Sequence, residues 1–164
     1  MINEKREELF AFDLDGTLLK SNISILFYKY AIKRFLFPWS SLFSCFFLYC
    51  NYKVFFNLPS FHYKVFKKIF FNKSLIELSE IASSFIKKHN WKKEVYWPAY
   101  EKLKYAQNKG AYTAIFSSSP DFLVKRIASL FGVNFFLASS YVCNEEGKCM
   151  RIFSLVDGCL KKKV

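Results

Sequence analysis

The sequence contains no Cys-x-x-Cys pair and no His-x-x-x-His pair, and its five cysteines are an odd number. A zinc site is therefore not expected, and reduced thiols in a cytoplasmic protein are the default interpretation. The first eight residues are charged and lead directly into an apolar segment, so no secretory signal is expected. The sequence also lacks internal repeats and low-complexity tracts, which argues against repeat architectures and disorder.

Aromatic and basic residues are both in excess. The 164-residue chain is 21% aromatic, and its 25 Lys and Arg against 13 Asp and Glu give a formal net charge of +12. An AT-rich genome would produce such an excess of Phe, Lys, Tyr and Ile without a functional cause. The charge favours an anionic partner, such as a phosphorylated substrate, a nucleic acid or an acidic membrane surface. The length suits one domain, with or without a sizeable insertion.

Three apolar runs have the length and flanking residues of buried strands. The first, Glu8–Leu14, ends before Gly16, and the second, Ala111–Phe116, ends before a row of serines. The third is Val133–Ser139. Helical patterns precede and follow the second run, so this order predicts an α/β fold with a parallel sheet. A hairpin is expected over Tyr141–Met150.

Two expected helices have clear end signals. For the helix after the second strand, Ser119 is the candidate N-cap, Pro120 the first helical residue and Gly132 the stop signal. In the preceding segment, Ser74 and Glu77 form a capping box at the start of another helix.

Residues 21–96 differ from the flanking segments, because they lack strand alternation and favour helices. They include an uncharged run, Phe35–Tyr52, that reaches the length of a transmembrane helix. A single span there would place Asp13 and Ser117 on opposite sides of a membrane, although both should lie in one sheet. A membrane span is therefore not expected.

A basic amphipathic helix is expected after this run. Lys64, Lys67 and Lys68 share one helix face, and apolar residues occupy much of the other. Such a helix can lie in a membrane interface, or it can pack its apolar face in the core and leave the lysines in water. The sequence leaves both interpretations open.

Two carboxylates follow the first expected strand directly. Asp13 and Asp15 would repel each other on one face of a strand, so a turn at Gly16 and a nearby cation are implied. Mg²⁺ prefers such oxygen ligands. One carboxylate can act as a nucleophile and the other as an acid and base, while the serines from Ser117 onward could bind an anion. This set of groups suits phosphoryl transfer.

The segments "FDLDGTLL" (Phe12–Leu19) and "AIFSSSP" (Ala114–Pro120) resemble the first and second motifs of the haloacid dehalogenase-like superfamily. The long separation of the two motifs resembles the phosphoserine-phosphatase-like branch, which carries a helical cap between them. The resemblance implies a Rossmann-like parallel-sheet core over 1–20 and 97–164. It also implies an inserted helical cap domain over 21–96.

The resemblance also implies roles for individual residues. Asp13 would be the nucleophile that becomes an aspartyl phosphate, and Asp15 would act as general acid and then base. Asp13 and the backbone carbonyl of Asp15 would hold Mg²⁺. Thr17 would orient Asp15 or the phosphate, and Ser117 with the Ser118 N–H would bind phosphoryl oxygens.

The C-terminal part of the family pattern is matched least. The third-motif lysine aligns best with Lys163, with Lys161 and Lys162 as substitutes, although this run could also be a solvated basic tail. The fourth motif, Gly-Asp followed by a further Asp, is absent before Val164. A truncated core is therefore expected, with weak Mg²⁺ affinity and poor activity of the chain alone.

The substrate is less defined than the chemistry. No carboxylate occurs between Leu18 and Phe35, where phosphoserine enzymes usually place one, so phosphoserine itself is doubtful. The aromatic and basic cap favours a lipid phosphate such as phosphatidylglycerophosphate. The alternatives are a small-molecule phosphatase of the phosphoserine type and a catalytically impaired remnant that acts as a membrane-surface or interaction protein. The expected location is cytoplasmic, with membrane association open, and no nucleic-acid partner is expected because the lysines are scattered.

Overall fold

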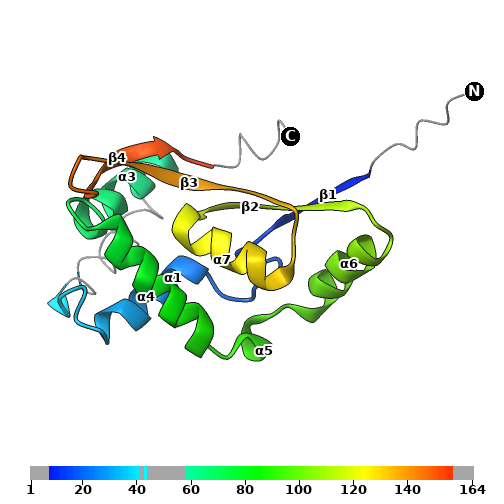
Figure 1. Ribbon diagram of the computed structural model, residues 1–164. Helices are drawn as coiled ribbons and strands as arrows, with labels where there is room; N and C mark the ends of the chain where they lie inside the picture. Colours follow the sequence, from blue (N-terminus) through cyan, green and yellow to red (C-terminus); the bar gives the residue numbers. More distant parts are fainter. Residues whose placement is uncertain (1–7, 41–42, 44–57, 157–164) are drawn as a thin grey trace, which may run out of the picture.

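The computed structural model describes residues 8–40, 43 and 58–156 (Figure 1). The described strands are β1 (Leu9–Asp13), β2 (Tyr112–Pro120), β3 (Phe135–Cys143) and β4 (Cys149–Ser154). The described helices are α1 (Ile23–Ile32), α3 (Leu58–Ile69), α4 (Leu75–Lys88), α5 (Trp91–Glu94), α6 (Trp97–Asn108) and α7 (Asp121–Phe131).

The strands form one sheet in the order β1-β2-β3-β4. Strands β1, β2 and β3 are parallel, and β4 returns antiparallel to β3 as the second arm of the predicted hairpin. Asp13 at the end of β1 pairs with Phe116, so β2 continues beyond the end of its neighbour. The prediction of an α/β fold with a parallel sheet is confirmed.

The start of α7 differs from the prediction. The serines extend β2 to Pro120, whose φ of −57° and ψ of 139° are extended, and the helix begins one residue later at Asp121. Ser119 is therefore not the N-cap, because its hydroxyl is bonded to Asp15 across the sheet instead. The end of the helix is as predicted, since Gly132 takes a left-handed conformation with a φ of 68°.

The helices around the sheet share one hydrophobic core. Phe27 of α1 lies between the rings of Phe85 on α4 and Phe122 on α7, at centroid distances of 6.0 and 5.6 Å. All three side chains are buried. The helices within 21–96 therefore pack directly on the α7 layer of the sheet, and the division into cap and core stays a prediction.

Helix α3 buries its apolar side. Phe66 and Ile69 are buried, and the Phe66 ring lies 5.0 Å from that of Tyr141 on β3, whereas Lys67 and Lys68 are exposed. The structure thus favours core packing over a membrane-interface role for this helix. No helix in the described part of the chain is long and apolar enough to cross a membrane. Most of the uncharged run lies outside the described residues.

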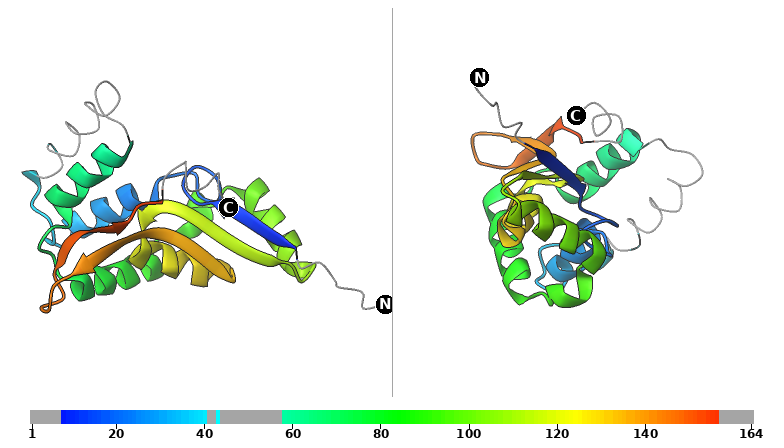
Figure 2. Two further views of the ribbon diagram at one scale, coloured as in Figure 1. Left: turned by 90° about the horizontal axis from the view of Figure 1, so that it is seen from above. Right: turned by 90° about the vertical axis from the view of Figure 1, so that its right-hand side faces the viewer.

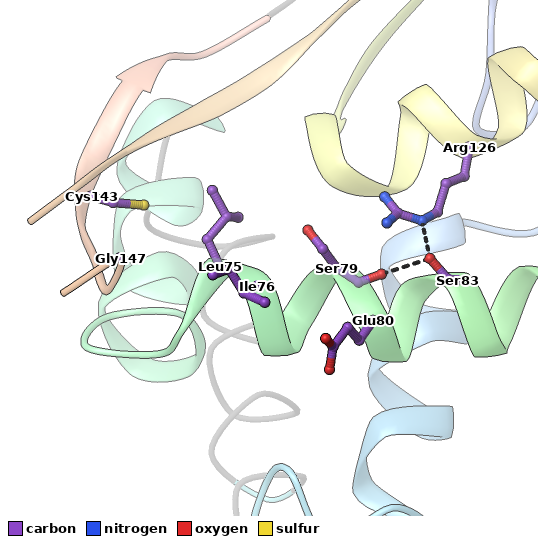
Figure 3. A pocket seen from close by; sticks show the side chains of 8 residues that line it. All are labelled: Leu75, Ile76, Ser79, Glu80, Ser83, Arg126, Cys143 and Gly147. Carbon is purple, nitrogen blue, oxygen red and sulfur yellow. Dashed lines mark hydrogen bonds between the residues drawn. The ribbon is translucent and has the colours of Figure 1, made fainter. Parts of the chain in front are cut away.

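A side-chain hydrogen bond ties α4 to α7. Arg126 Nε donates to Ser83 Oγ at 2.8 Å (Figure 3). Arg126 Nη1 donates to the Phe122 carbonyl within α7. We expect Ser83→Ala to lower the free energy of unfolding by about 1 kcal/mol, because Nε loses its acceptor. Urea unfolding measures this change. Ser84→Ala, one residue along the same helix, is the matched control, and equal stability of the two variants would contradict the expectation.

Candidate active site

Asp13 and Asp15 lie where β1 ends and the chain turns. Asp13 is the last residue of β1, and Gly16 has a φ of 79°, which an L side chain rarely adopts. The turn is closed by the Gly16 N–H, which donates to the Leu19 carbonyl at 2.7 Å, and by the Leu19 N–H, which donates to the Leu14 carbonyl at 2.9 Å. Glycine therefore lets the chain reverse directly after the second carboxylate.

The Asp15 carboxylate is held by groups from α1 and β2. The Ile23 N–H, in the first turn of α1, donates to Oδ1 at 2.7 Å. The hydroxyls of Ser117 and Ser119 donate to Oδ2 at 3.0 and 2.8 Å. Residues far apart in the sequence thus converge on one side chain.

The geometry of β2 explains why both serines reach Asp15. Phe116 pairs with Asp13, so Ser117 and Ser119 lie just beyond the end of β1, and positions two apart share a strand face. The Ser119 hydroxyl also lies 2.8 Å from Ser24 Oγ. Because Ser119 gives its only hydroxyl hydrogen to Asp15, Ser24 is the donor of this second bond.

Burial dominates the electrostatics of Asp15. Loss of water around the carboxylate raises its pKa above the ordinary value of 3.8, and the negative charge of Asp13 adds to the rise. The hydrogen bonds from Ile23, Ser119 and Ser117 oppose this rise without cancelling it. Asp15 therefore keeps a proton to a higher pH than an exposed aspartate does.

Of the other predicted site residues, Asp13, Thr17 and Ser118 are described by the structure and the C-terminal lysines are not. Asp13 is half-buried, and its Oδ1 accepts the Leu14 N–H at 3.0 Å. Thr17 is half-buried in the turn after Asp15, and the Ser118 carbonyl accepts the Ser139 hydroxyl at 2.8 Å. Lys161, Lys162 and Lys163 lie outside the described residues.

Ser24 and the Ile23 amide were not predicted as site groups, and Ser119 was predicted as an N-cap in a row of anion-binding serines rather than as a partner of Asp15. The spacing of Ser119 from Ser117 could have indicated a shared strand face, but the following proline favoured an N-cap instead. Ser24 gave no local signal, because its contact spans 95 positions of sequence.

Few metal ligands gather at this site. Within the described ranges, no group of three or more His, Cys, Asp or Glu side chains could hold a metal ion. Both side-chain oxygens of Asp15 already accept protein hydrogen bonds. The Asp13 carboxylate therefore offers oxygen donors of the kind that suit a hard cation.

A separate hollow lies between α4, α7 and the β3–β4 hairpin. It has a volume of about 400 Å³ (Figure 3). Its lining residues are Leu75, Ile76, Ser79, Glu80, Ser83, Arg126, Cys143 and Gly147. Neither Asp13 nor Asp15 lines it, so this hollow is distinct from the carboxylate site.

Comparisons with known proteins identify the fold. A family model of haloacid dehalogenase-like hydrolases matches residues 10–159. A protein of unknown function from Bordetella pertussis Tohama I has a TM-score of 0.74 and 19% identity, over 89% of this chain and 66% of its own. A substrate-bound phosphoserine phosphatase has a TM-score of 0.58 and 16% identity, over 91% of this chain and 63% of its own. A phospho-aspartyl intermediate analogue of phosphoserine phosphatase has a TM-score of 0.56 and 18% identity, over 89% of this chain and 62% of its own.

These structural similarities, at low sequence identity, show a shared fold alone. This chain spans less than two thirds of the length of each of the three structures. No curated protein sequence matches the chain. The family model nevertheless covers most of it, from the first carboxylate motif through the β3–β4 hairpin. The chain belongs to the haloacid dehalogenase-like hydrolase family.

Proposed function

We propose that the protein is a phosphomonoesterase that works through an aspartyl phosphate on Asp13. The observation that carries this proposal is the pair of carboxylates at the end of β1. One of them, Asp15, is half-buried, accepts several hydrogen bonds and has a raised pKa. The reaction needs an ionised carboxylate as the nucleophile and a proton for the leaving alkoxide. Asp13 can serve as the nucleophile, and Asp15 can supply the proton.

The proposed reaction has two steps. An Asp13 carboxylate oxygen attacks phosphorus, the bond between phosphorus and the ester oxygen breaks, and Asp15 gives its proton to the departing oxygen. Asp15, now a carboxylate, takes a proton from water as that water attacks the phosphorus of the acyl phosphate. Inorganic phosphate leaves, and both aspartates return to their starting states.

The surrounding hydroxyls can accommodate both protonation states of Asp15. When Asp15 is ionised, the Ser119 hydroxyl donates to it and Ser24 donates to Ser119. When Asp15 carries a proton on Oδ2, that proton can be donated to Ser119, whose own hydrogen then turns toward Ser24. The Ile23 N–H holds Oδ1 in both states. This arrangement lets the proton be gained and lost without moving the side chain.

Mg²⁺ fits the donors that the site offers. Asp13 and the backbone carbonyl of Asp15 would hold it, because Mg²⁺ usually takes one or two carboxylates and keeps several waters. When bound, the ion neutralises negative charge on the phosphoryl group. The proposal of a magnesium site rests on these two residues of the described chain.

The substrate is proposed only as a class. The similar structures include a phosphoserine phosphatase with its substrate bound and one that mimics the phospho-aspartyl intermediate, which supports a phosphoric monoester. A lipid phosphate stays a prediction that rests on composition. We also propose that residues 21–96 act as a cap, because α1 begins against Asp15 and brings Ser24 to the site. Thr17, Ser117, Ser118 and Lys163 stay proposed phosphate-binding residues.

Hydrolysis of p-nitrophenyl phosphate tests this function. We expect phosphate release that requires Mg²⁺, stops on addition of excess EDTA and returns when Mg²⁺ is restored. Inorganic phosphate is measured directly, which also detects slow turnover. Activity that EDTA leaves unchanged would contradict the proposed magnesium site.

A further inference from the structure

Two cysteines face each other across the β3–β4 hairpin. Cys143 and Cys149 are register partners of the antiparallel pair, and their Sγ atoms, both free thiols, are 4.0 Å apart. The Cys149 N–H donates to the Lys73 carbonyl rather than to Cys143, so this is a non-hydrogen-bonded pair. Opposed residues of that type have Cα atoms about 4.5 Å apart, and a disulfide spans Cα distances of about 4.4–6.8 Å. A disulfide can therefore form here without rebuilding the backbone.

The two thiols differ in their access to solvent. Cys149 is fully buried, whereas Cys143 is half-buried and lines the hollow between the hairpin, α4 and α7. Figure 3 shows the Cys143 sulfur directed from the hairpin toward α4. Burial raises the pKa of the Cys149 thiol, and the neighbouring Cys143 raises it further, so Cys149 keeps its proton at neutral pH. A molecule that enters the hollow therefore meets Cys143 first.

A metal site would be the other use of two adjacent thiols. Zinc takes four protein ligands in structural sites and three in catalytic sites. Within residues 8–40, 43 and 58–156, no group of three or more His, Cys, Asp or Glu side chains could hold an ion. The two cysteines are thus placed to bond to each other, but the part of the chain described here supplies no further ligand beside them.

We propose that Cys143 and Cys149 form a reversible dithiol–disulfide pair that exchanges with small disulfides of the glutathione class. The Cys143 thiolate attacks one sulfur of the small disulfide, whose S–S bond breaks. Cys149 then attacks the Cys143 sulfur of this mixed disulfide. Each of the two departing small thiolates takes up one of the two thiol protons, so the protein is oxidised by two electrons and the small disulfide is reduced to two thiols. This inference is independent of the proposed phosphatase function.

The hollow suits a reactant of this class. Its volume of about 400 Å³ lies within the range of small-molecule sites, roughly 300–1,000 Å³. Arg126 places a guanidinium on its wall and Glu80 a carboxylate. These two groups can pair with the carboxylate and ammonium groups of a glutathione unit. The hollow therefore offers both entry and charge complementarity to a small zwitterionic disulfide.

The disulfide would act on the joint between the hairpin and α4. The Asn72 N–H donates to the Cys149 carbonyl at 2.8 Å, and the Leu75 N–H donates to the Gly147 carbonyl at 3.0 Å. Figure 2 shows the hairpin at one end of the sheet, beside the start of α4. A disulfide closes the loop 144–148 and restricts the segment that accepts these bonds, so hydrogen exchange of both amides should slow on oxidation. Unchanged exchange of both amides in the oxidised protein would contradict this effect.

A redox titration of the purified full-length protein is the first part of the test. The protein is equilibrated with reduced and oxidised glutathione, quenched with acid and N-ethylmaleimide, and mapped by peptide mass spectrometry. We expect a disulfide between Cys143 and Cys149. Its ratio to the dithiol should rise about tenfold when both forms of glutathione are diluted tenfold at a fixed ratio, because its formation releases two thiols. A glutathione adduct that does not respond to dilution, or two thiols that stay reduced, would overturn the proposal.

Cysteine variants test the order of the two steps. In Cys149→Ser, glutathione should remain on Cys143 as a mixed disulfide. In Cys143→Ser, Cys149 should react with oxidised glutathione at least about tenfold more slowly than Cys143 does in Cys149→Ser, because Cys149 is buried. Cys149→Ala is the second variant, should the buried serine hydroxyl unfold the protein. Equal reaction rates of the two thiols, or linkage of Cys143 to a cysteine other than Cys149, would overturn the proposal.

Discussion

Replacing Asp13 with asparagine (Asp13→Asn) should reduce phosphate release at least about a thousandfold. The neutral amide is a poor nucleophile and forms no acyl phosphate. The change should leave the fold intact, because the amide oxygen of asparagine can accept the bond that the Leu14 N–H now gives to Oδ1. Phosphate release and urea unfolding of the two proteins measure both effects.

The matched control for this experiment is Glu101→Gln. It removes one exposed carboxylate from α6 by the same chemical change. We expect its phosphate release to equal that of the unmodified protein. Equal activity of Asp13→Asn and Glu101→Gln would mean that Asp13 is not the nucleophile.

Replacing Asp15 with asparagine (Asp15→Asn) should remove activity and raise stability together. The amide cannot carry the proton of the leaving group, so phosphate release should fall at least about a hundredfold. At any pH where Asp15 is ionised, the amide removes a desolvated negative charge, so the melting temperature should rise there by a few degrees. Asparagine can still accept from Ile23 and donate to Ser117 and Ser119, which keeps the contacts.

The difference in stability between Asp15→Asn and the unmodified protein should depend on pH, and this dependence tests whether burial of the Asp15 charge causes it. The pKa of Asp15 is raised in the folded protein above 3.8, so the folded state binds a proton more readily than the unfolded state. The unmodified protein therefore gains stability as the pH falls through the raised pKa, and the gain is complete below 3.8. The advantage of Asp15→Asn should shrink over that range. An advantage that grows as the pH falls would contradict burial as the cause.

The sequence predicts the centre of the site because its signals are local. An apolar run followed by Asp13, Asp15 and Gly16 marks a strand that ends in a turn. The serines mark the end of a second strand. The carboxyl ends of parallel strands lie at the same edge of a sheet, and in the structure the Ser117 hydroxyl donates a hydrogen bond to Asp15. The prediction that these segments come together is therefore confirmed, whereas their catalytic roles stay proposals.

The contacts that complete the site depend on tertiary packing. Ser119 before Pro120 has the pattern of an N-cap, but the Asp15 carboxylate across the sheet offers its hydroxyl a stronger, charge-assisted bond. Ser24 joins the site because α1 folds back beside the end of β2. The sequence pattern of α3 also left open whether its apolar face packs in the core or lies in a membrane interface. The answer depends on a distant segment, because Phe66 packs against Tyr141 on β3.

The covalent intermediate tests the central claim most directly. The protein is incubated briefly with acetyl phosphate and Mg²⁺, quenched in acid, treated with borohydride to reduce an acyl phosphate to homoserine, and analysed by peptide mass spectrometry. We predict reduction at position 13 in the unmodified protein and none in Asp13→Asn. An unreduced Asp13 in folded protein, or a phosphoryl group on another residue, would contradict the proposed mechanism.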